Sequence, residues 1–367
     1  MATAFTNAKI FTGENFEEGK AVLADMGIIT GIVDADSIPG GYTISDIGGY
    51  NLAPAFIDLQ IYGGNGRMFS DNPDHETLDS TCQYSKAGGA SHFMITLATN
   101  SIDTFLKGMI AVRSYWQEGG QGLLGLHLEG PYINAKKKGA HIEKYIKKPE
   151  LDELKMLMDK GGDVIKMITV APEVCSDEVL EYLLENVTVV SAGHTNATYK
   201  EAQSGFGKGI MAATHLFNAM TGLQHREPGM VGAIFNDPNV MSSIVCDGIH
   251  VDFAAVRIAK KVMGERLFYI TDAVAESRVG SYQHILKNDR YTLPDGTLSG
   301  SSLTMMKCVK NGIEKAGISP EESLRMAAEY PGNLLLRDMQ IGKIQIHYAA
   351  SFVVFDDEYN VLRVIVD

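Results

Sequence analysis

From Ala55 onward, short apolar runs alternate with helix-like segments, and this alternation constrains the fold more than any other feature. Several of the amphipathic segments between the runs end in glycine, the usual residue just past a helix C-terminus. The eight runs have the length of buried strands and cover residues 55–61, 91–98, 123–129, 164–171, 187–193, 210–217, 240–247 and 266–273. Eight alternations of strand and helix predict an α/β fold, a parallel (β/α)8 TIM-like barrel.

The two ends of the chain have a different pattern. Residues 1–53 contain short β-like runs separated by Gly, Asn and Asp, and the tail after residue 340 is β-like again. We expect residues 1–53 and 338–367 to form one small β-sandwich domain beside a barrel domain over residues 54–337. The turn-rich link after the eighth run, residues 277–300, predicts a hairpin excursion, and two helical segments follow it.

Composition limits the partners that the protein can have. The net charge of −13, with no Lys/Arg-rich run, argues against nucleic-acid binding, so an anionic substrate needs local groups to hold it. No apolar stretch reaches the roughly 18 residues of a transmembrane helix, and no signal peptide is visible. The four cysteines are far apart and form no CxxC pair. We therefore expect a cytoplasmic protein without a membrane or nucleic-acid partner.

Titratable side chains stand at the ends of the predicted strands, where barrel enzymes carry their catalytic groups. A single histidine in such a place is most often a structural residue with satisfied hydrogen bonds. Several titratable groups at the same end of one barrel favour an active site. These groups, from the third, fifth, sixth, seventh and eighth strands, are Glu129, His194, His215, Asp247 with His250, and Asp272.

Three of these residues form a chemically plausible metal-ligand set. Glu129, His194 and His215 supply one carboxylate and two imidazoles, which suits Zn²⁺ with a position open for water. The alternative is that Glu129 pairs with a lysine while both histidines pack as polar core, and the spacing alone does not decide between the two. Asp272 would take a proton from metal-bound water and deliver it to a leaving group, or it is a capping or ion-paired residue.

Five motifs carry a resemblance to a known family. In chain order they are "LHLEGPYINAKKKGAH", "AGHTNATY", "THLFNAMTGLQHREPGMVG", "CDGIHVD" and "ITDA". Together they resemble the N-acetylglucosamine-6-phosphate deacetylase family of the amidohydrolase superfamily, from about residue 52 to about residue 305. The resemblance implies a (β/α)8 barrel with a small β-sandwich from both chain ends. It also implies hydrolysis of an N-acetylated hexosamine 6-phosphate to the free amine and acetate, in amino-sugar catabolism.

The resemblance also implies roles for individual residues. It places the metal on Glu129, His194 and His215 and the acid/base role on Asp272. It makes Arg226 the phosphate partner, with help from His225. It also implies a homodimer, in which either residue acts in the site of its own subunit or in that of the neighbouring subunit. The substrate-binding set further comprises Ala140, His141, Asn218, Ala219, Asp247, His250 and the closing segment Leu298, Ser299 and Gly300.

The stretch "AFIDLQIYGGNG" departs from a common amidohydrolase pattern. Alternation puts Asp58, Gln60 and Tyr62 on one face of the first strand. Many amidohydrolases carry H-x-H there and bind a second metal, whereas Gln60 and Tyr62 are poor Zn²⁺ ligands. We therefore predict one divalent ion per subunit, with Zn²⁺ as the best fit and Fe²⁺, Mn²⁺ or Co²⁺ as alternatives. Gln60 and Tyr62 would fill the vacant second position and bond to water, Asp272 or the ligand shell.

Three other functions compete with the deacetylation of N-acetylglucosamine 6-phosphate. The first is the same reaction on N-acetylgalactosamine 6-phosphate, which differs in the orientation of one hydroxyl. The second is a cyclic-amide hydrolase of the dihydroorotase or hydantoinase kind, which needs the two-metal centre that the missing H-x-H argues against. The third is a catalytically inactive sugar-phosphate sensor, which would not need the complete set Glu129, His194, His215 and Asp272.

Overall fold

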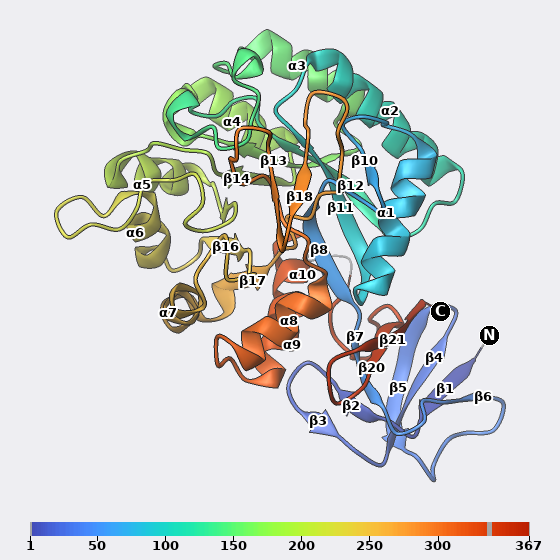
Figure 1. The fold of residues 1–367 in the computed structure, drawn as a ribbon. Coiled ribbons are helices and arrows are strands. Elements are labelled where there is room, and N and C mark those ends of the chain that lie inside the picture. The colour runs from blue at the N-terminus through green and yellow to red at the C-terminus, as the bar shows by residue number, and fades with distance from the viewer. Residues whose placement is uncertain (1, 336–339, 367) are drawn as a thin grey trace.

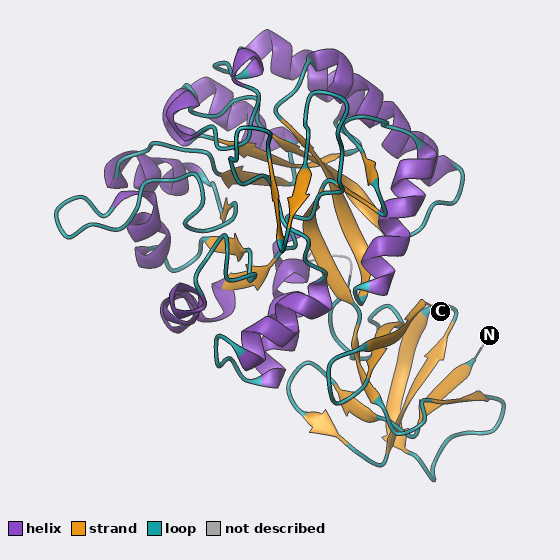
Figure 2. Ribbon diagram, in the orientation of Figure 1, coloured by secondary structure: helices purple, strands orange, loops and turns teal. Residues whose placement is uncertain are grey.

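The protein has two parts, a large helix-covered barrel and a smaller β domain that contains both termini (Figure 1). The computed structural model describes residues 2–335 and 340–366. Helices surround the strands of the barrel on its outside (Figure 2). Among the described residues, no helix combines the length and the apolar character needed to cross a bilayer.

Eight parallel strands form the barrel, and each of the eight predicted runs overlaps one of them. The run at 210–217 contains only a two-residue strand, so some strands are shorter than their runs. The barrel closes where Tyr62 N donates to Ala273 O at 2.9 Å and Asp272 N donates to Gln60 O at 3.0 Å. In sheet order the strands are β8 (Phe56–Ile61), β11 (Ala90–Ala98), β12 (Leu123–Glu129), β13 (Ile165–Val170), β14 (Val189–Ala192), β15 (Ala212–Ala213), β16 (Met241–Ile244) and β17 (Leu267–Tyr269).

Several of the α-helices begin where the sequence offers a capping side chain. Asp74 accepts a hydrogen bond from Thr77 N at the start of α1, and Thr198 with Glu201 forms a capping box at α5. The α-helices are α1 (His75–Ala87), α2 (Ile102–Gln117), α3 (Leu151–Gly161), α4 (Asp177–Asn186), α5 (Tyr199–Lys208), α6 (Gly229–Asn236), α7 (Phe253–Met263), α8 (Met305–Glu314), α9 (Pro320–Ala327) and α10 (Glu329–Leu335). The 3₁₀ turns are η1 (Ala135–Lys137), η2 (Glu143–Tyr145), η3 (Pro172–Val174) and η4 (Gly264–Arg266).

One helix of the barrel, α6, corresponds to no amphipathic segment of the sequence. The sequence of α6, "GMVGAIFN", is apolar nearly all round, so it shows none of the amphipathic periodicity that marks the others.

Two hairpins lie near the carboxyl ends of the barrel strands. The first consists of β9 (Gly63–Gly64) and β10 (Arg67–Met68), and the second of β18 (Ile285–Lys287) and β19 (Arg290–Thr292). The second hairpin confirms the excursion predicted after the eighth strand.

Two sheets form the small domain. One has the order β5 (Ile28–Asp34), β4 (Lys20–Asp25), β1 (Thr3–Thr6), β6 (Thr43–Asp46). The other has the order β21 (Val361–Val366), β20 (Ser351–Phe355), β7 (Asn51–Pro54), β2 (Lys9–Phe11), β3 (Phe16–Glu17).

One hydrophobic cluster joins the two sheets of the small domain. Phe5 and Val22 of the first sheet pack with Leu52 and Phe352 of the second. The pairing of β20 with β7 brings the C-terminal segment into the N-terminal domain, which confirms the predicted fold class. The exact domain boundaries stay a prediction, because the 53/54 boundary falls inside β7 and the 337/338 boundary lies outside the described residues.

Asp58 of β8 holds the seam at which the barrel closes. Its carboxylate accepts hydrogen bonds from Thr271 Oγ1 at 2.5 Å, Thr271 N at 3.2 Å and Gln60 N at 3.3 Å. The residue is 1% exposed, and this burial raises its pKa to about 7 although the three donors favour the charged form. The polar residue inside a core strand is thus paired, as the cost of burying polar groups requires.

The raised pKa predicts that Asp58 makes stability depend on pH. Between the ordinary carboxyl pKa near 4 and about 7, the folded state binds more protons than the unfolded state, so the contribution of Asp58 is present at low pH and lost as pH rises through about 7. Its upper limit is roughly 4 kcal/mol. Asp58→Asn should remove this term. The urea-denaturation midpoint of the variant, relative to that of the wild type, should therefore be higher at pH 8 than at pH 5. Parallel stability curves for the two proteins would contradict the assignment.

Candidate active site

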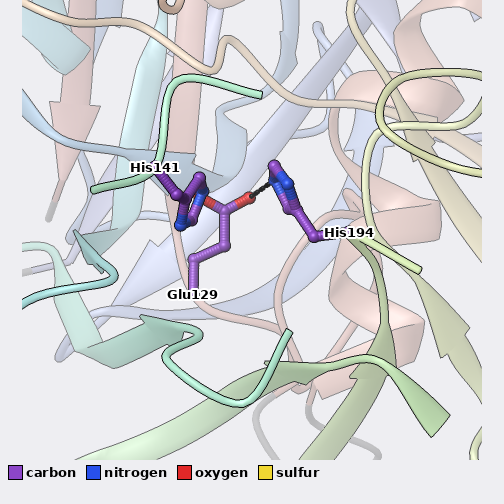
Figure 3. A group of neighbouring side chains, drawn as sticks. All are labelled: Glu129, His141 and His194. Atoms are coloured by element: carbon purple, nitrogen blue, oxygen red, sulfur yellow. Dashed lines mark hydrogen bonds and ion pairs between the residues drawn. The ribbon is translucent and has the colours of Figure 1, made fainter. Parts of the chain in front are cut away.

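Glu129, the last residue of β12, lies at the centre of a group of buried histidines at the carboxyl end of the barrel. Its side chain is 2% exposed. His215 Nε2 lies 3.0 Å and His194 Nε2 lies 3.3 Å from Glu129 Oε1, while His141 Nε2 lies 3.1 Å from Oε2. Figure 3 shows His141 and His194 on opposite sides of the Glu129 carboxylate. The cluster therefore has one carboxylate and three imidazoles available for a metal ion.

The spacing of three donor atoms fits one metal ion. Glu129 Oε1, His194 Nε2 and His215 Nε2 are 3.0–3.3 Å apart, including 3.1 Å between the two nitrogens. Ligand atoms about 2.1 Å from a tetrahedral ion lie about 3.4 Å from one another, so little outward movement is needed to admit an ion. A second trio, Glu129, His141 and His194, lies within 4.8 Å of one another and overlaps the first.

Hydrogen bonds distinguish the roles of the histidines. His194 Nδ1 donates to the carbonyl oxygen of Lys137 at 2.9 Å, so the neutral ring keeps a lone pair on the Nε2 that faces Glu129. His141 Nδ1 lies 2.7 Å from Thr99 Oγ1 and accepts from Thr99 N at 3.4 Å, which leaves the proton on Nε2 to donate to Glu129. His215 Nδ1 is buried and has no partner among the described residues. These bonds favour His194 as a ligand and His141 as a donor to the ligand shell.

Three site residues have a left-handed backbone conformation. The φ angles are +46° at His194, +37° at His215 and +54° at Asp272. Such angles are costly for non-glycine residues and gather at functional sites in folded proteins. Each of the three follows the end of a short strand, and the bend turns its side chain into the mouth of the barrel.

Gln60 and Tyr62 connect Glu129 to Asp272. Gln60 Nε2 donates to Asp272 Oδ1 at 2.8 Å and to Glu129 Oε1 at 3.0 Å, and it lies 2.8 Å from Tyr62 Oη. Tyr62 Oη donates to Glu129 Oε2 at 2.5 Å. Burial and the nearby carboxylates raise the pKa of Tyr62 well above its usual value, so the side chain is a neutral phenol. An amide and a phenol thus occupy the position where an H-x-H pair would stand.

The pKa values of the two site carboxyls are shifted in opposite directions. Burial alone would raise the pKa of Glu129, but His141 and His194 outweigh it and hold that pKa well below the usual range. For Asp272, burial raises the pKa, the charge of Glu129 raises it further, and the neighbouring histidines only partly oppose this. Glu129 is therefore set as a permanent anion, and Asp272 is the carboxyl better suited to accept and release a proton.

His250 is held by Asp247, the first polar residue after β16. Asp247 Oδ2 lies 2.6 Å from His250 Nδ1, and its Oδ1 accepts from the backbone N–H groups of His250 at 2.7 Å and Ile249 at 2.8 Å. Asp247 does not line the pocket, whereas His250 does. The geometry therefore makes Asp247 a support for His250 and not a direct contact for a ligand.

One pocket contains the cluster and most residues named from the sequence. Gln60 does not line the pocket, but it bonds to the lining residues Glu129 and Asp272. Two lining residues that sequence reasoning missed are Tyr282 and His284 of the excursion, whose sequence has turn signals but no motif. The residues named from the sequence that line the pocket are Tyr62, Glu129, Ala140, His141, His194, His215, Asn218, Ala219, His250, Asp272, Leu298, Ser299 and Gly300.

The structure does not bring Arg226 or His225 to the pocket of their own chain. Both are exposed in the loop that leads into α6, which projects away from the barrel (Figure 1). Over the described ranges, no lysine or arginine lines the pocket. Within a single chain the site thus offers metal donors, a proton carrier and hydrogen-bonding groups, but no cation for a phosphate.

Comparison with known proteins agrees with this chemistry. Residues 51–367 match the amidohydrolase family. The N-acetylglucosamine-6-phosphate deacetylase of Haemophilus influenzae is 33% identical, over 100% of this chain and 98% of its own length. An N-acetylgalactosamine-6-phosphate deacetylase of Escherichia coli O157:H7 is 30% identical, over 95% and 94% of the two chains.

The fold shows the same relationship. The crystal structure of the N-acetylglucosamine-6-phosphate deacetylase from Pasteurella multocida superposes with a TM-score of 0.95 at 34% identity, covering 100% of this chain and 98% of the other. The enzyme class predicted from the motifs is confirmed. The chain belongs to the N-acetylglucosamine-6-phosphate deacetylase family of the amidohydrolases.

Proposed function

We propose that the protein hydrolyses the acetamide of N-acetylglucosamine 6-phosphate to glucosamine 6-phosphate and acetate. The observation that carries the proposal is the placement of Asp272 and the Glu129–His194–His215 donors in one buried pocket at the carboxyl end of the barrel. Similarity to deacetylases named for this substrate supports it. The relative named for the galactosamine epimer makes N-acetylgalactosamine 6-phosphate the second candidate substrate.

One divalent metal ion, with Zn²⁺ as the best fit, would be held by Glu129, His194 and His215. The near-tetrahedral spacing of their donor atoms favours this set, and the proton that His141 Nε2 donates to Glu129 argues against the set that includes His141. When bound there, the ion would polarise the acetyl carbonyl and lower the pKa of a water molecule. Gln60 and Tyr62 leave no second set of good ligands on β8, which supports a one-metal site.

Asp272 supplies the proton transfers. Gln60 occupies its Oδ1, and Oδ2 has no partner among the described residues, so Oδ2 is free to take a proton from the attacking water. The same carboxyl then gives that proton to the departing amine nitrogen, which completes the hydrolysis. His250, whose Nδ1 is fixed by Asp247, presents Nε2 to the pocket and would hydrogen-bond the substrate near the reacting group.

The phosphate would be bound by a neighbouring subunit. Because no cationic side chain among the described residues lines the pocket, and Arg226 is exposed on a projecting loop, Arg226 is better placed to reach the site of a second copy. Guanidinium is the appropriate partner for phosphate, and His225 would assist it. This arrangement requires a homodimer.

A cytoplasmic location also belongs to the proposal, since the four cysteines are free, as in a reducing compartment.

The proposed reaction is tested by acetate release from three substrates with metal-replete protein. N-acetylglucosamine 6-phosphate should be turned over fastest, and unphosphorylated N-acetylglucosamine should react far more slowly because the anion contact is lost. Preference for N-acetylgalactosamine 6-phosphate would keep the chemistry and change the substrate. No acetate from any of the three would reject deacetylation and return the protein to the sugar-phosphate sensor hypothesis.

Replacement of the proton carrier should separate catalysis from metal binding. Asp272→Asn keeps an acceptor for Gln60 but cannot carry the proton, so kcat should fall by about 10²–10⁴. Asp103→Asn, on the exposed surface of α2, serves as the matched control and should keep the wild-type rate. Both variants should retain about one equivalent of metal by elemental analysis. A normal rate for Asp272→Asn, or two tightly held equivalents in the wild type, would contradict the mechanism.

Subunit complementation tests where Arg226 acts. Arg226→Ala should raise KM for the phosphorylated substrate by about 10–100-fold, the usual loss for a charged hydrogen bond. If Arg226 acts in the neighbouring subunit, mixing and re-forming dimers of Arg226→Ala with Asp272→Asn should restore about a quarter of the wild-type activity, because each mixed dimer regains one complete site. Absence of recovery despite mixed-dimer formation would place Arg226 in its own site or outside both.

A further inference from the structure

The excursion after β17 covers one side of the pocket and contributes a histidine to which no role has been assigned. His284 precedes β18 and lines the same pocket as Glu129 and Asp272. Its side chain is 4% exposed. It lies outside the groups of donor atoms that could hold a metal among the described residues. Its presence in the pocket therefore needs a different explanation from metal binding.

Several contacts hold the His284 ring in place. Its Nδ1 lies 3.0 Å from Ser299 Oγ, and its ring stacks on Tyr282 with centroids 6.1 Å apart and planes 6° apart. The backbone oxygen of His284 accepts from Ser277 N at 3.0 Å. Tyr282 in turn donates to the carbonyl oxygen of Thr99 at 2.7 Å. Two contacts thus hold the ring itself, and the backbone bond to Ser277 anchors the residue.

The Tyr282 contact ties His284 to the metal-donor cluster. Thr99, which accepts from Tyr282, also contacts His141 Nδ1 at 2.7 Å, and His141 bonds to Glu129. A movement of the excursion would therefore disturb the Thr99–His141 contact. Through Tyr282, Thr99 and His141, the His284 ring is thus connected to Glu129.

The remaining nitrogen of His284 is available for a ligand. Within the part of the chain that the structure describes, Nε2 has no hydrogen-bond partner, although the side chain is nearly buried and faces the pocket. Burial also lowers the pKa of His284 to about 4, so the ring is neutral near pH 7. A neutral imidazole is a poor partner for a phosphate dianion, but it exchanges a good hydrogen bond with a hydroxyl group.

We propose that His284 is a specificity-determining residue whose Nε2 hydrogen-bonds one ring hydroxyl of the hexosamine substrate. The proposal rests on the proposed function, since it names a contact within the same pocket. A buried polar group that pairs with a substrate hydroxyl discriminates strongly against a substrate that lacks it, because the group is then left unpaired. His284 would therefore set which hydroxyl pattern the enzyme accepts.

The test combines changes in the enzyme with changes in the substrate. His284→Phe keeps a planar ring against Tyr282 but removes Nε2, and His284→Gln restores a polar group near the Nε2 position. His75→Phe is the matched control, because His75 also lies against a tyrosine, Tyr115, but outside the pocket. The kcat/KM of each protein is measured on N-acetylglucosamine 6-phosphate, its galactosamine epimer, and the 1-deoxy, 3-deoxy and 4-deoxy analogues.

We expect His284→Phe to lose about 10–100-fold in kcat/KM on the complete substrate. The wild type should show a similar loss on one deoxy analogue, and His284→Phe should show no further loss on that analogue. His284→Gln should recover part of the loss, and His75→Phe should match the wild type on every substrate. Metal content should be equal in all four proteins.

Two results would overturn the inference while the wild type remains active. One is a kcat/KM of His284→Phe within twofold of wild type on the complete substrate. The other is a loss that is equal on all five substrates, which indicates a structural role only. If the wild type itself turns over neither epimer, the proposed function fails, and that result is distinct from either of these two.

Discussion

The buried carboxylate of Glu129 is the group on which the rest of the site depends. Five side chains from different elements place a polar atom within 3.3 Å of its two oxygens, and three of them are imidazoles. A charge at this depth is tolerable only when it is paired, so the surrounding residues must be placed by the barrel before the site can exist. The neighbouring histidines hold the pKa of this carboxylate low, and the buried anion makes the cluster a natural site for a cation.

The first barrel strand supports the proposal of a single metal ion. Gln60 and Tyr62 stand where many amidohydrolases carry metal-binding histidines. Here Gln60 donates hydrogen bonds to Glu129 and Asp272, and Tyr62 donates one to Glu129. The Gln60 amide therefore bridges the two carboxylates. Such a bridge holds Asp272 in position without neutralising it, which suits the proton-transfer role proposed for this residue.

Much of the fold was predictable because strand burial and helix amphipathicity are local patterns. All eight barrel strands, the hairpin excursion and the small domain from both chain ends follow the expected order. The strand–helix order leaves a place for α6, although its sequence is too uniformly apolar to show a helical period. In the site, the strand-end rule located Glu129, His194, His215 and Asp272, because residues at the carboxyl ends of parallel strands meet in space whatever their distance along the chain.

Other features of the site left no local signal. His284 belongs to a turn-rich excursion and enters the pocket only because Tyr282 and Ser299 fold it there. Asp247 belongs to the same short motif as His250, yet only its hydrogen bonds show that it supports that histidine from outside the pocket. The exposure of Arg226 likewise depends on where the loop before α6 projects.

The sequence by itself determined the barrel, the family and the chemical types of the central residues, because local periodicity or short motifs are enough to predict each of them. Only the tertiary structure decided which atoms meet. It set the spacing of about 3 Å among the donors of Glu129, His194 and His215, the Gln60 bridge to Asp272, and the separation of Arg226 from its own pocket. The physical reason is that side-chain distances depend on barrel closure and on left-handed backbone bends at His194, His215 and Asp272, which no local pattern encodes.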